Sequence, residues 1–146
     1  MQIVASADSG LRPRVVGAVA VGGAIGATAR WGSNELVASV TNATTDPTVA
    51  AAFPWATFAV NVVGALLVAV ATANIERGTA RWAFTVTGVL GGFTTMSAFG
   101  VELNELVDAD RTDTAALYLG ATFAIAAGAF LLAERVAKPP RFGHES

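Results

Sequence analysis

Apolar residues gather in four long runs along the chain, and polar segments separate them. The runs cover residues 15–40, 55–73, 82–101 and 114–133, and the links are short except for a Thr-, Asn- and Ala-rich connector at 41–53. A helix rises about 1.5 Å per residue, so roughly 20 residues cross the hydrocarbon core of a bilayer. The pattern predicts an all-α integral membrane protein with four transmembrane helices.

The third run contains a cluster of residues that a regular helix does not favour. Between Gly88 and Phe99 lie three glycines and three hydroxyl residues, in a run without charge from Trp82 to Val101. A membrane helix tolerates such a cluster where neighbouring helices or a cavity satisfy the freed backbone groups. Interrupted helices of this kind hold ions or substrates in membrane proteins. We therefore predict a Gly/Thr break in the third span, with a functional role.

Composition supports the membrane prediction and narrows the chemistry. Hydrophobic residues make up 53% of the 146 residues, charged residues 14%, and the mean hydropathy is +0.56. The chain has no cysteine, which excludes disulfides, thiol catalysis and cysteine-based metal sites, and its one histidine, His144, lies in a polar tail. A cleaved signal peptide is the alternative for the first run, because Ala27-Thr28-Ala29 resembles a cleavage site. Arg30 follows that site directly, however, and three further runs remain.

Basic residues are distributed unequally between the two sides of the membrane. The side with both termini and the 74–81 link carries seven, whereas the other side carries Arg111 alone, with Arg30 inside or at the edge of the first run. The positive-inside rule predicts that both termini lie in the cytoplasm, and we expect a multi-pass protein of the plasma membrane. We assign residues 1–14 and 136–146 to cytoplasmic tails and 15–135 to one four-helix transmembrane domain. The seven basic residues are Arg12, Arg14, Arg77, Arg81, Arg135, Lys138 and Arg141, and the acidic residues assigned to the outer loops are Glu35, Asp46, Glu102, Glu105, Asp108, Asp110 and Asp113.

Polar and small residues inside the runs are candidates for function or for helix packing. Asn61 lies about six residues into the second run, where interhelical hydrogen bonding and pore lining explain it equally well. Gly22, Gly23 and Gly26 form a small-residue face that favours close packing of helices. No Asp, Glu, Lys or His occupies the middle of a run, which argues against a proton-coupled carrier and an intramembrane protease.

Three local patterns, in order along the four runs, resemble the CrcB/Fluc family of fluoride channels over nearly the whole chain from Val15 to Ala133. They are the glycine-rich segment from Gly22 to Arg30-Trp31, the segment Thr57-Phe-Ala-Val-Asn61-Val-Val-Gly64, and the Gly88–Phe99 segment. The resemblance implies four-span subunits that pair antiparallel, form two pores along the dimer and hold a central sodium ion. The implied activity is passive export of cytoplasmic fluoride by a channel, which is not an enzyme.

The resemblance also implies roles for individual residues. Asn61 corresponds to a pore asparagine whose amide donates to fluoride, and Phe99 to one of two phenylalanines whose electropositive ring edges face the ion. Arg30 corresponds to an arginine of the first span, which we assign to anchoring or vestibule electrostatics. The other implied positions are Met96, Ser97, Thr95, Tyr118 and Thr122 along the fluoride pore, and Gly91 and Thr94 as ligands of Na+ through their backbone carbonyls.

Two features of the chain leave alternatives open. Met96 stands where the family has its first ring-pair phenylalanine, and a thioether has no comparable electropositive edge, so we expect a weaker pore or one degenerate pore of two. The charge bias favours one-way insertion and a heterodimer with an oppositely oriented paralogue, and the alternative is an antiparallel homodimer. Outside the family, the alternatives are a small multidrug-type antiporter, which needs an embedded carboxylate, and a non-conducting structural subunit of a membrane complex.

Overall fold

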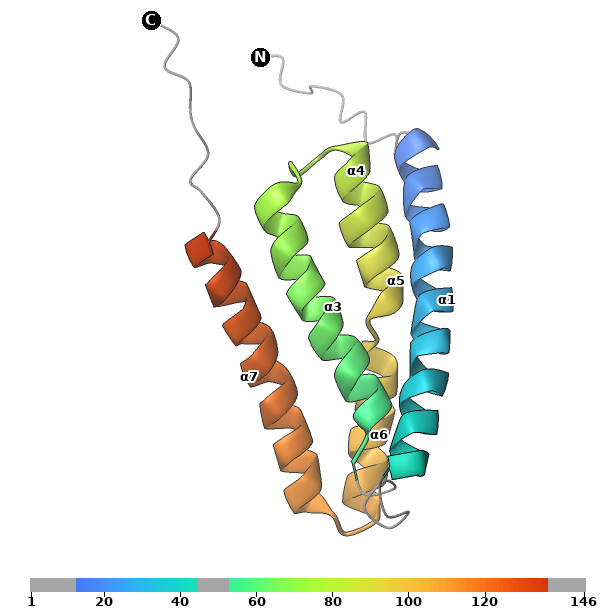
Figure 1. Ribbon diagram of the computed structural model, residues 1–146, viewed down its shortest axis with the longest axis vertical. Coiled ribbons are helices and arrows are strands. Elements are labelled where there is room, and N and C mark those ends of the chain that lie inside the picture. The colour runs from blue at the N-terminus through green and yellow to red at the C-terminus, as the bar shows by residue number, and fades with distance from the viewer. Residues whose placement is uncertain (1–12, 45–52, 137–146) are drawn as a thin grey trace, which may run out of the picture.

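The computed structural model describes residues 13–44 and 53–136, and these form a bundle of long helices (Figure 1). The chain enters in α1 (Pro13–Thr44) and returns in α3 (Trp55–Asn74). A composite third helix follows, and α7 (Thr112–Val136) completes the bundle. The composite helix consists of α4 (Ala80–Trp82), the π-helical segment η1 (Ala83–Leu90), α5 (Gly91–Phe93) and α6 (Met96–Asp108).

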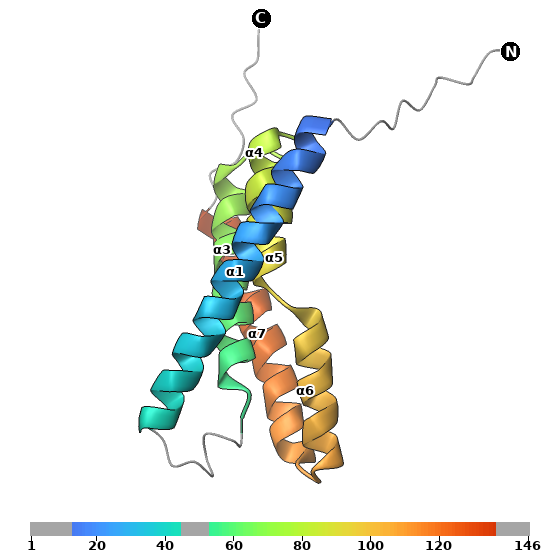
Figure 2. The ribbon, with the colours of Figure 1, turned by 90° about the vertical axis from the view of Figure 1, so that its right-hand side faces the viewer.

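The helices lie roughly along one axis, but they pack against different neighbours at the two ends of the bundle. α1 packs against α4, η1 and α5, whereas α6 packs against α7, and α3 contacts members of both groups. After the middle of the bundle, the second half of α1 and the whole of α6 separate (Figure 2). The first turn of α1, the turn between α3 and α4 and the last turn of α7 lie at one end, which we call the α3–α4 end (Figure 1). The opposite end, with the turn between α6 and α7, is the α6–α7 end.

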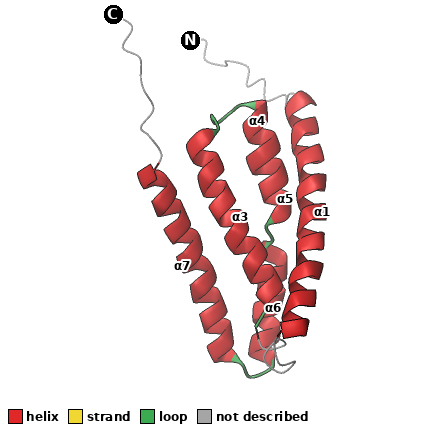
Figure 3. Cartoon of the chain, viewed as in Figure 1, coloured by secondary structure: helices red, strands yellow, loops and turns green. Residues whose placement is uncertain are grey.

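The all-α, four-span part of the predicted fold class is confirmed. Every regular element in the described ranges is helical (Figure 3). Large apolar side chains such as Leu66, Leu67 and Leu131 are exposed on the outside of the bundle, which suits contact with lipid rather than with water. The helices that are long and apolar enough to cross a membrane are Pro13–Thr41, Trp55–Asn74, Ala80–Asp108 and Thr112–Ala133.

The third helix extends beyond the predicted run, and this corrects the assignment of several acidic residues. Glu102, Glu105 and Asp108 lie in α6 rather than in an outer loop. Glu35 likewise belongs to α1, and Asp113 to the first turn of α7. A backbone helix continues past the end of an apolar run because its hydrogen bonds do not depend on hydropathy. The predicted tails lie almost wholly outside the described residues, as does Asp46.

Two turns with left-handed backbone residues reverse the chain. Gly78 has a φ of 81° in the turn between α3 and α4, a conformation that glycine adopts without strain. Asp110 has a φ of 58° between α6 and α7, where a short polar side chain tolerates it. The Arg111 backbone N–H donates to the Leu106 carbonyl at 2.8 Å, so the helix ends in the wrapped geometry of a Schellman-type cap. These stop signals, rather than the loss of apolar residues, end α6.

Glycines allow the first and third helices to touch through their backbones. A Cβ added to Gly22 would lie 2.5 Å from the Phe84 carbonyl oxygen, and one added to Gly26 would collide with the Val89 carbonyl oxygen. Gly92 meets α1 in the same way, since its added Cβ would lie 2.5 Å from the Gly23 oxygen. The packing role predicted for this glycine face is therefore confirmed for Gly22 and Gly26.

We expect Gly26→Ala to lower the free energy of unfolding by about 1–3 kcal/mol, because the added methyl forces α1 away from η1 and α5. Denaturant unfolding of the purified chain in detergent measures the change. Gly23→Ala is the matched control, because an added Cβ there meets nothing within 4 Å. Equal losses in the two variants would show that intrinsic helix propensity, and not the close approach, determines the effect.

Candidate functional site

The composite third helix is interrupted at Thr94 and Thr95. α5 ends at Phe93, Thr94 has ψ 157°, and Thr95 has φ −143° and ψ 120°, so two residues in succession are extended. The Thr95 hydroxyl oxygen then accepts from the Ala98 backbone N–H at 3.2 Å and caps the start of α6. An interruption inside a membrane span leaves backbone groups without helical partners, and these need partners from elsewhere in the bundle.

Asn61 on α3 supplies partners for one of the two extended residues. Its side-chain Nδ2 donates to the Thr95 carbonyl at 2.9 Å, and its Oδ1 accepts from the Thr95 backbone N–H at 2.8 Å. The amide side chain thus pairs with the peptide groups of Thr95 as a second backbone would. Interhelical hydrogen bonding is therefore a role of Asn61 in this fold. The Nδ2 group has a second N–H, for which the described residues supply no partner.

Arg30 supplies a partner for the other extended residue. Its guanidinium Nη1 donates to the Thr94 carbonyl at 3.2 Å, across from α1 to the interruption. The positive charge of Arg30 is thus held at the break and does not extend freely toward either end of the bundle. Thr94 was predicted as a sodium ligand through this same carbonyl. That oxygen has two lone pairs, and the guanidinium uses one of them.

A hollow of about 280 Å³ lies beside the interruption, between α3, α6 and α7. Several of its lining side chains are exposed, Met96 to 69%, so the hollow is open on one side. None of the described residues that line it is charged. The lining comprises Asn61, Ala65, Val68, Thr94, Thr95, Met96, Phe99, Thr122, Phe123, Ala126 and Phe130.

The structure brings together most, but not all, of the predicted pore residues. Asn61, Thr95, Met96, Phe99 and Thr122 line the hollow. The Thr122 hydroxyl donates to the Tyr118 carbonyl of its own helix at 2.7 Å, so its proton is already used.

Of the remaining predicted positions, Thr94 also lines the hollow, whereas the others are not part of its lining. Ser97 is exposed one residue after Met96, with its Oγ 3.3 Å from the Thr95 hydroxyl. Gly91 is exposed in α5, and Arg30 contacts the break from the side of α1. Tyr118 is fully buried, and its ring centroid lies 4.7 Å from that of Phe99.

Glu102 is the site residue that the sequence analysis missed. One carboxylate oxygen accepts from the Thr57 hydroxyl at 2.6 Å, and the other accepts from the Tyr118 hydroxyl at 2.8 Å. Thr57 is 3% exposed and Tyr118 0%, so this network joins α3, α6 and α7 in the interior. The sequence did contain a signal for this role, because Glu102 follows Phe99 by three residues and therefore lies on the same face of the helix. The third helix therefore does carry a carboxylate.

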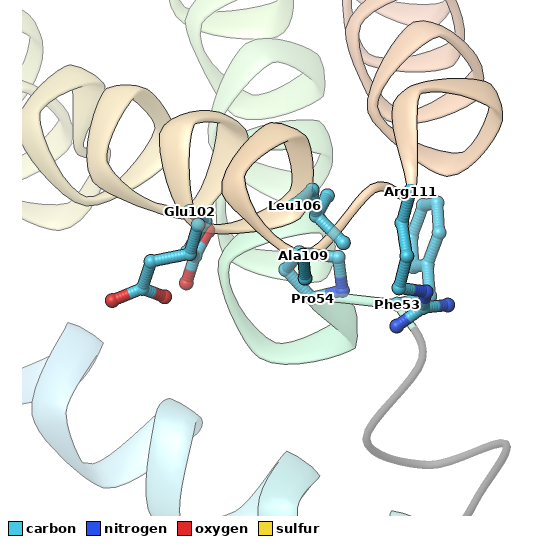
Figure 4. A pocket seen from close by; sticks show the side chains of 7 residues that line it. Phe53, Pro54, Glu102, Leu106, Ala109 and Arg111 are labelled. Carbon is cyan, nitrogen blue, oxygen red and sulfur yellow. The ribbon is translucent and has the colours of Figure 1, made fainter.

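A second hollow, of about 290 Å³, lies toward the α6–α7 end. Glu102 and Arg111 lie on opposite sides of it, with Leu106 and Ala109 between them (Figure 4). Phe99 lines the first hollow, while Glu102 lines the second and binds Tyr118, the neighbour of Phe99. The contact between Phe99 and Tyr118 thus lies between the two hollows.

Four spans, an interrupted third helix and an uncharged hollow at the interruption define a small multi-pass membrane protein. Residues 17–133 match the family described as CrcB-like protein, Camphor Resistance (CrcB). The chain belongs to this family, which is a family of non-enzymatic membrane proteins.

Curated relatives support the assignment. The chain is 44% identical over 115 residues to fluoride-specific ion channel FluC 2 of Streptomyces avermitilis. The aligned region covers 74% of this chain and 65% of that protein. It is 41% identical over 117 residues to fluoride-specific ion channel FluC of Novosphingobium aromaticivorans, and the alignment covers 77% of this chain and 88% of that protein. It is also 38% identical over 128 residues to fluoride-specific ion channel FluC 1 of Streptomyces coelicolor, and the alignment covers 84% of this chain and 77% of that protein. The chain thus spans just under two thirds of the first of these relatives and most of the other two.

Proposed function

We propose that this chain is a subunit of a fluoride-specific ion channel that passively exports fluoride from the cytoplasm. Family membership supports the substrate, because the relatives are named for it. The observation that carries the proposal in this chain is the hollow at the interruption, which offers a hydrogen-bond donor and aromatic rings without any charged side chain. A fixed cation there would hold an anion too tightly for conduction.

The donors fit a small, strongly hydrated anion. A pore for fluoride has to replace hydrogen bonds from water, and we assign this donation to the second N–H of Asn61, because Asn61 lines the hollow. Phe99 lines the same hollow, and aromatic ring edges are electropositive. Met96 offers a thioether in place of a ring edge, so we expect a conductance below that of a pore with two phenylalanines.

A second subunit is part of the proposal. The hollow is open on one side, and the outer face of α1 has a shallow depression that another helix can approach. It is lined by Ile25 and by the smaller residues Ala24, Thr28 and Ala29. The arrangement proposed is an antiparallel pair in the plasma membrane. Arg14, Arg77, Arg81 and Arg135 lie at the α3–α4 end and favour its cytoplasmic placement. Because this bias favours one-way insertion, we propose a paralogue of opposite orientation as the partner, with a homodimer as the alternative.

A structural sodium ion is also proposed, on the carbonyls of Gly91 and Thr94. Support comes from the end of α5, where carbonyl oxygens lose their helical partners, and carbonyl oxygens suit a hard cation. The described residues contain no group of His, Cys, Asp or Glu that could hold a metal ion instead. The Arg30 guanidinium occupies one lone pair of the Thr94 carbonyl oxygen, so one lone pair of that oxygen remains for the ion.

Fluoride efflux from liposomes tests the function. Vesicles loaded with potassium fluoride and containing only this chain are given valinomycin to balance charge, and a fluoride electrode records release. A self-sufficient channel gives rapid efflux of fluoride and none of chloride under the same gradient. If the sodium proposal holds, vesicles prepared without sodium release fluoride more slowly than vesicles prepared with it.

The other outcomes separate the alternatives. No efflux from a folded, monodisperse preparation, followed by efflux after co-expression with an oppositely biased paralogue, supports the heterodimer. Efflux from the chain alone contradicts an obligatory heterodimer. No efflux in either preparation contradicts the channel proposal and favours the structural subunit.

A further inference from the structure

Three arginines cluster at the α3–α4 end of the bundle. Arg77 lies in the turn after α3, Arg81 lies in α4, and Arg14 lies in the first turn of α1, and all three side chains are exposed. α1 contacts α4, and the first turn of α1 stands beside α4 (Figure 1). Segments far apart in the sequence thus bring three exposed arginines to the same end of the bundle.

The described part of the protein does not neutralise these charges. None of the three arginines forms an ion pair with a carboxylate in the two described ranges, and Glu76 is the one acidic residue described in this turn. Arg77 makes a cation–π contact instead, with its guanidinium 5.5 Å from the centroid of the Trp82 ring. A cluster of guanidinium groups without carboxylate partners is suited to a phosphate, which arginine binds through paired hydrogen bonds.

The position of Trp82 indicates that this cluster lies at the depth of the lipid headgroups. It is half-buried and stands where the apolar part of the third span begins, and tryptophan prefers the membrane–water interface. The anions that are always present at that depth are the phosphates of phospholipids. Anionic lipids add a net negative charge that basic residues near the surface attract.

We propose that Arg14, Arg77 and Arg81 form a binding site for the headgroup of one anionic phospholipid, with the Trp82 ring beneath it. Each arginine contributes a charge-assisted contact to the lipid phosphate, and the aromatic ring packs against the glycerol and the first part of an acyl chain. The site is separate from the hollow at the interruption, so lipid binding does not depend on whether the chain conducts fluoride.

Native mass spectrometry of the full-length chain in detergent tests the site. The protein is mixed with equal amounts of dioleoyl phosphatidylglycerol and dioleoyl phosphatidylcholine, which differ in headgroup only. We expect one phosphatidylglycerol to be retained in preference to phosphatidylcholine. Each arginine at a membrane surface contributes about a fivefold factor in affinity, so the Arg77→Gln/Arg81→Gln variant should lose the preference by roughly 25-fold.

Arg135→Gln is the matched control, because Arg135 is exposed at the same end but on α7. This variant should retain the preference, and Arg77→Lys/Arg81→Lys should retain part of it. An equal loss in Arg135→Gln would overturn the site in favour of diffuse electrostatics, as would equal retention of the two lipids by the unchanged chain. If the double glutamine variant does not fold, Arg14→Gln replaces it, with an expected fivefold loss.

Discussion

The Asn61→Asp variant is expected to lose fluoride efflux by at least about a hundredfold while it still folds. Aspartate has no N–H, so the donor that we assign to fluoride is removed, and its carboxylate adds a negative charge beside the path of an anion. Aspartate still offers an oxygen to the Thr95 backbone N–H, which preserves one of the two hydrogen bonds that Asn61 makes to Thr95. Liposome efflux measures the flux, and circular dichroism with thermal melting checks the fold.

Asn74→Asp is the matched control for this prediction. Asn74 is the last residue of the same helix, is exposed, and donates to the Val70 carbonyl of its own helix at 2.7 Å. Its replacement makes the same chemical change away from the hollow, so efflux should stay within about twofold of the unchanged chain. Undiminished efflux in Asn61→Asp would remove Asn61 from the proposed path. An equal loss in Asn74→Asp would instead point to a general effect of charge on α3.

The Glu102→Ala variant is expected to lose about 2–6 kcal/mol of unfolding free energy. The change leaves the hydroxyls of Thr57 and Tyr118 buried without their acceptor, and each unsatisfied group costs about 1–3 kcal/mol. Denaturant unfolding in detergent measures the loss. Glu102→Gln keeps one carbonyl acceptor and a donor amide, so it should recover a large part of the stability.

Glu105→Ala provides the comparison on the same helix. Glu105 is exposed, so its loss should change the unfolding free energy by no more than about 0.5 kcal/mol. A similar loss of stability in both alanine variants would show that removing an acidic residue from α6, and not breaking the buried network, causes the effect.

The apolar pattern predicted the four spans because membrane insertion depends on the same quantity that the pattern measures. Trp55 begins α3 as expected, and the second span ends within one residue of the prediction. Hydropathy does not record where a helix ends, however. The termination of α6 depends on the left-handed Asp110 and the backbone bond of Arg111, so Glu102 was assigned to a loop although it lies in a helix.

The contacts at the site could be predicted only in part. Spacing placed Asn61 on a helix but left its role open, because its partner Thr95 is 34 residues away in sequence and belongs to another span. The same limit applies to Arg30, whose acceptor at Thr94 is 64 residues away. Hydrogen bonds of this kind depend on how helices are arranged in three dimensions, whereas periodicity describes one helix at a time.

The interruption at Thr94 and Thr95 also divides the third helix into two parts that pack against different helices. Before it, the third helix packs on α1 through glycine backbones, and after it, the chain packs on α7 through aromatic side chains. α3 contacts both halves, and Asn61 joins it to the junction itself. The third helix therefore consists of two halves with different packing partners, and the backbone torsion angles of Thr94 and Thr95 set the angle between the two halves.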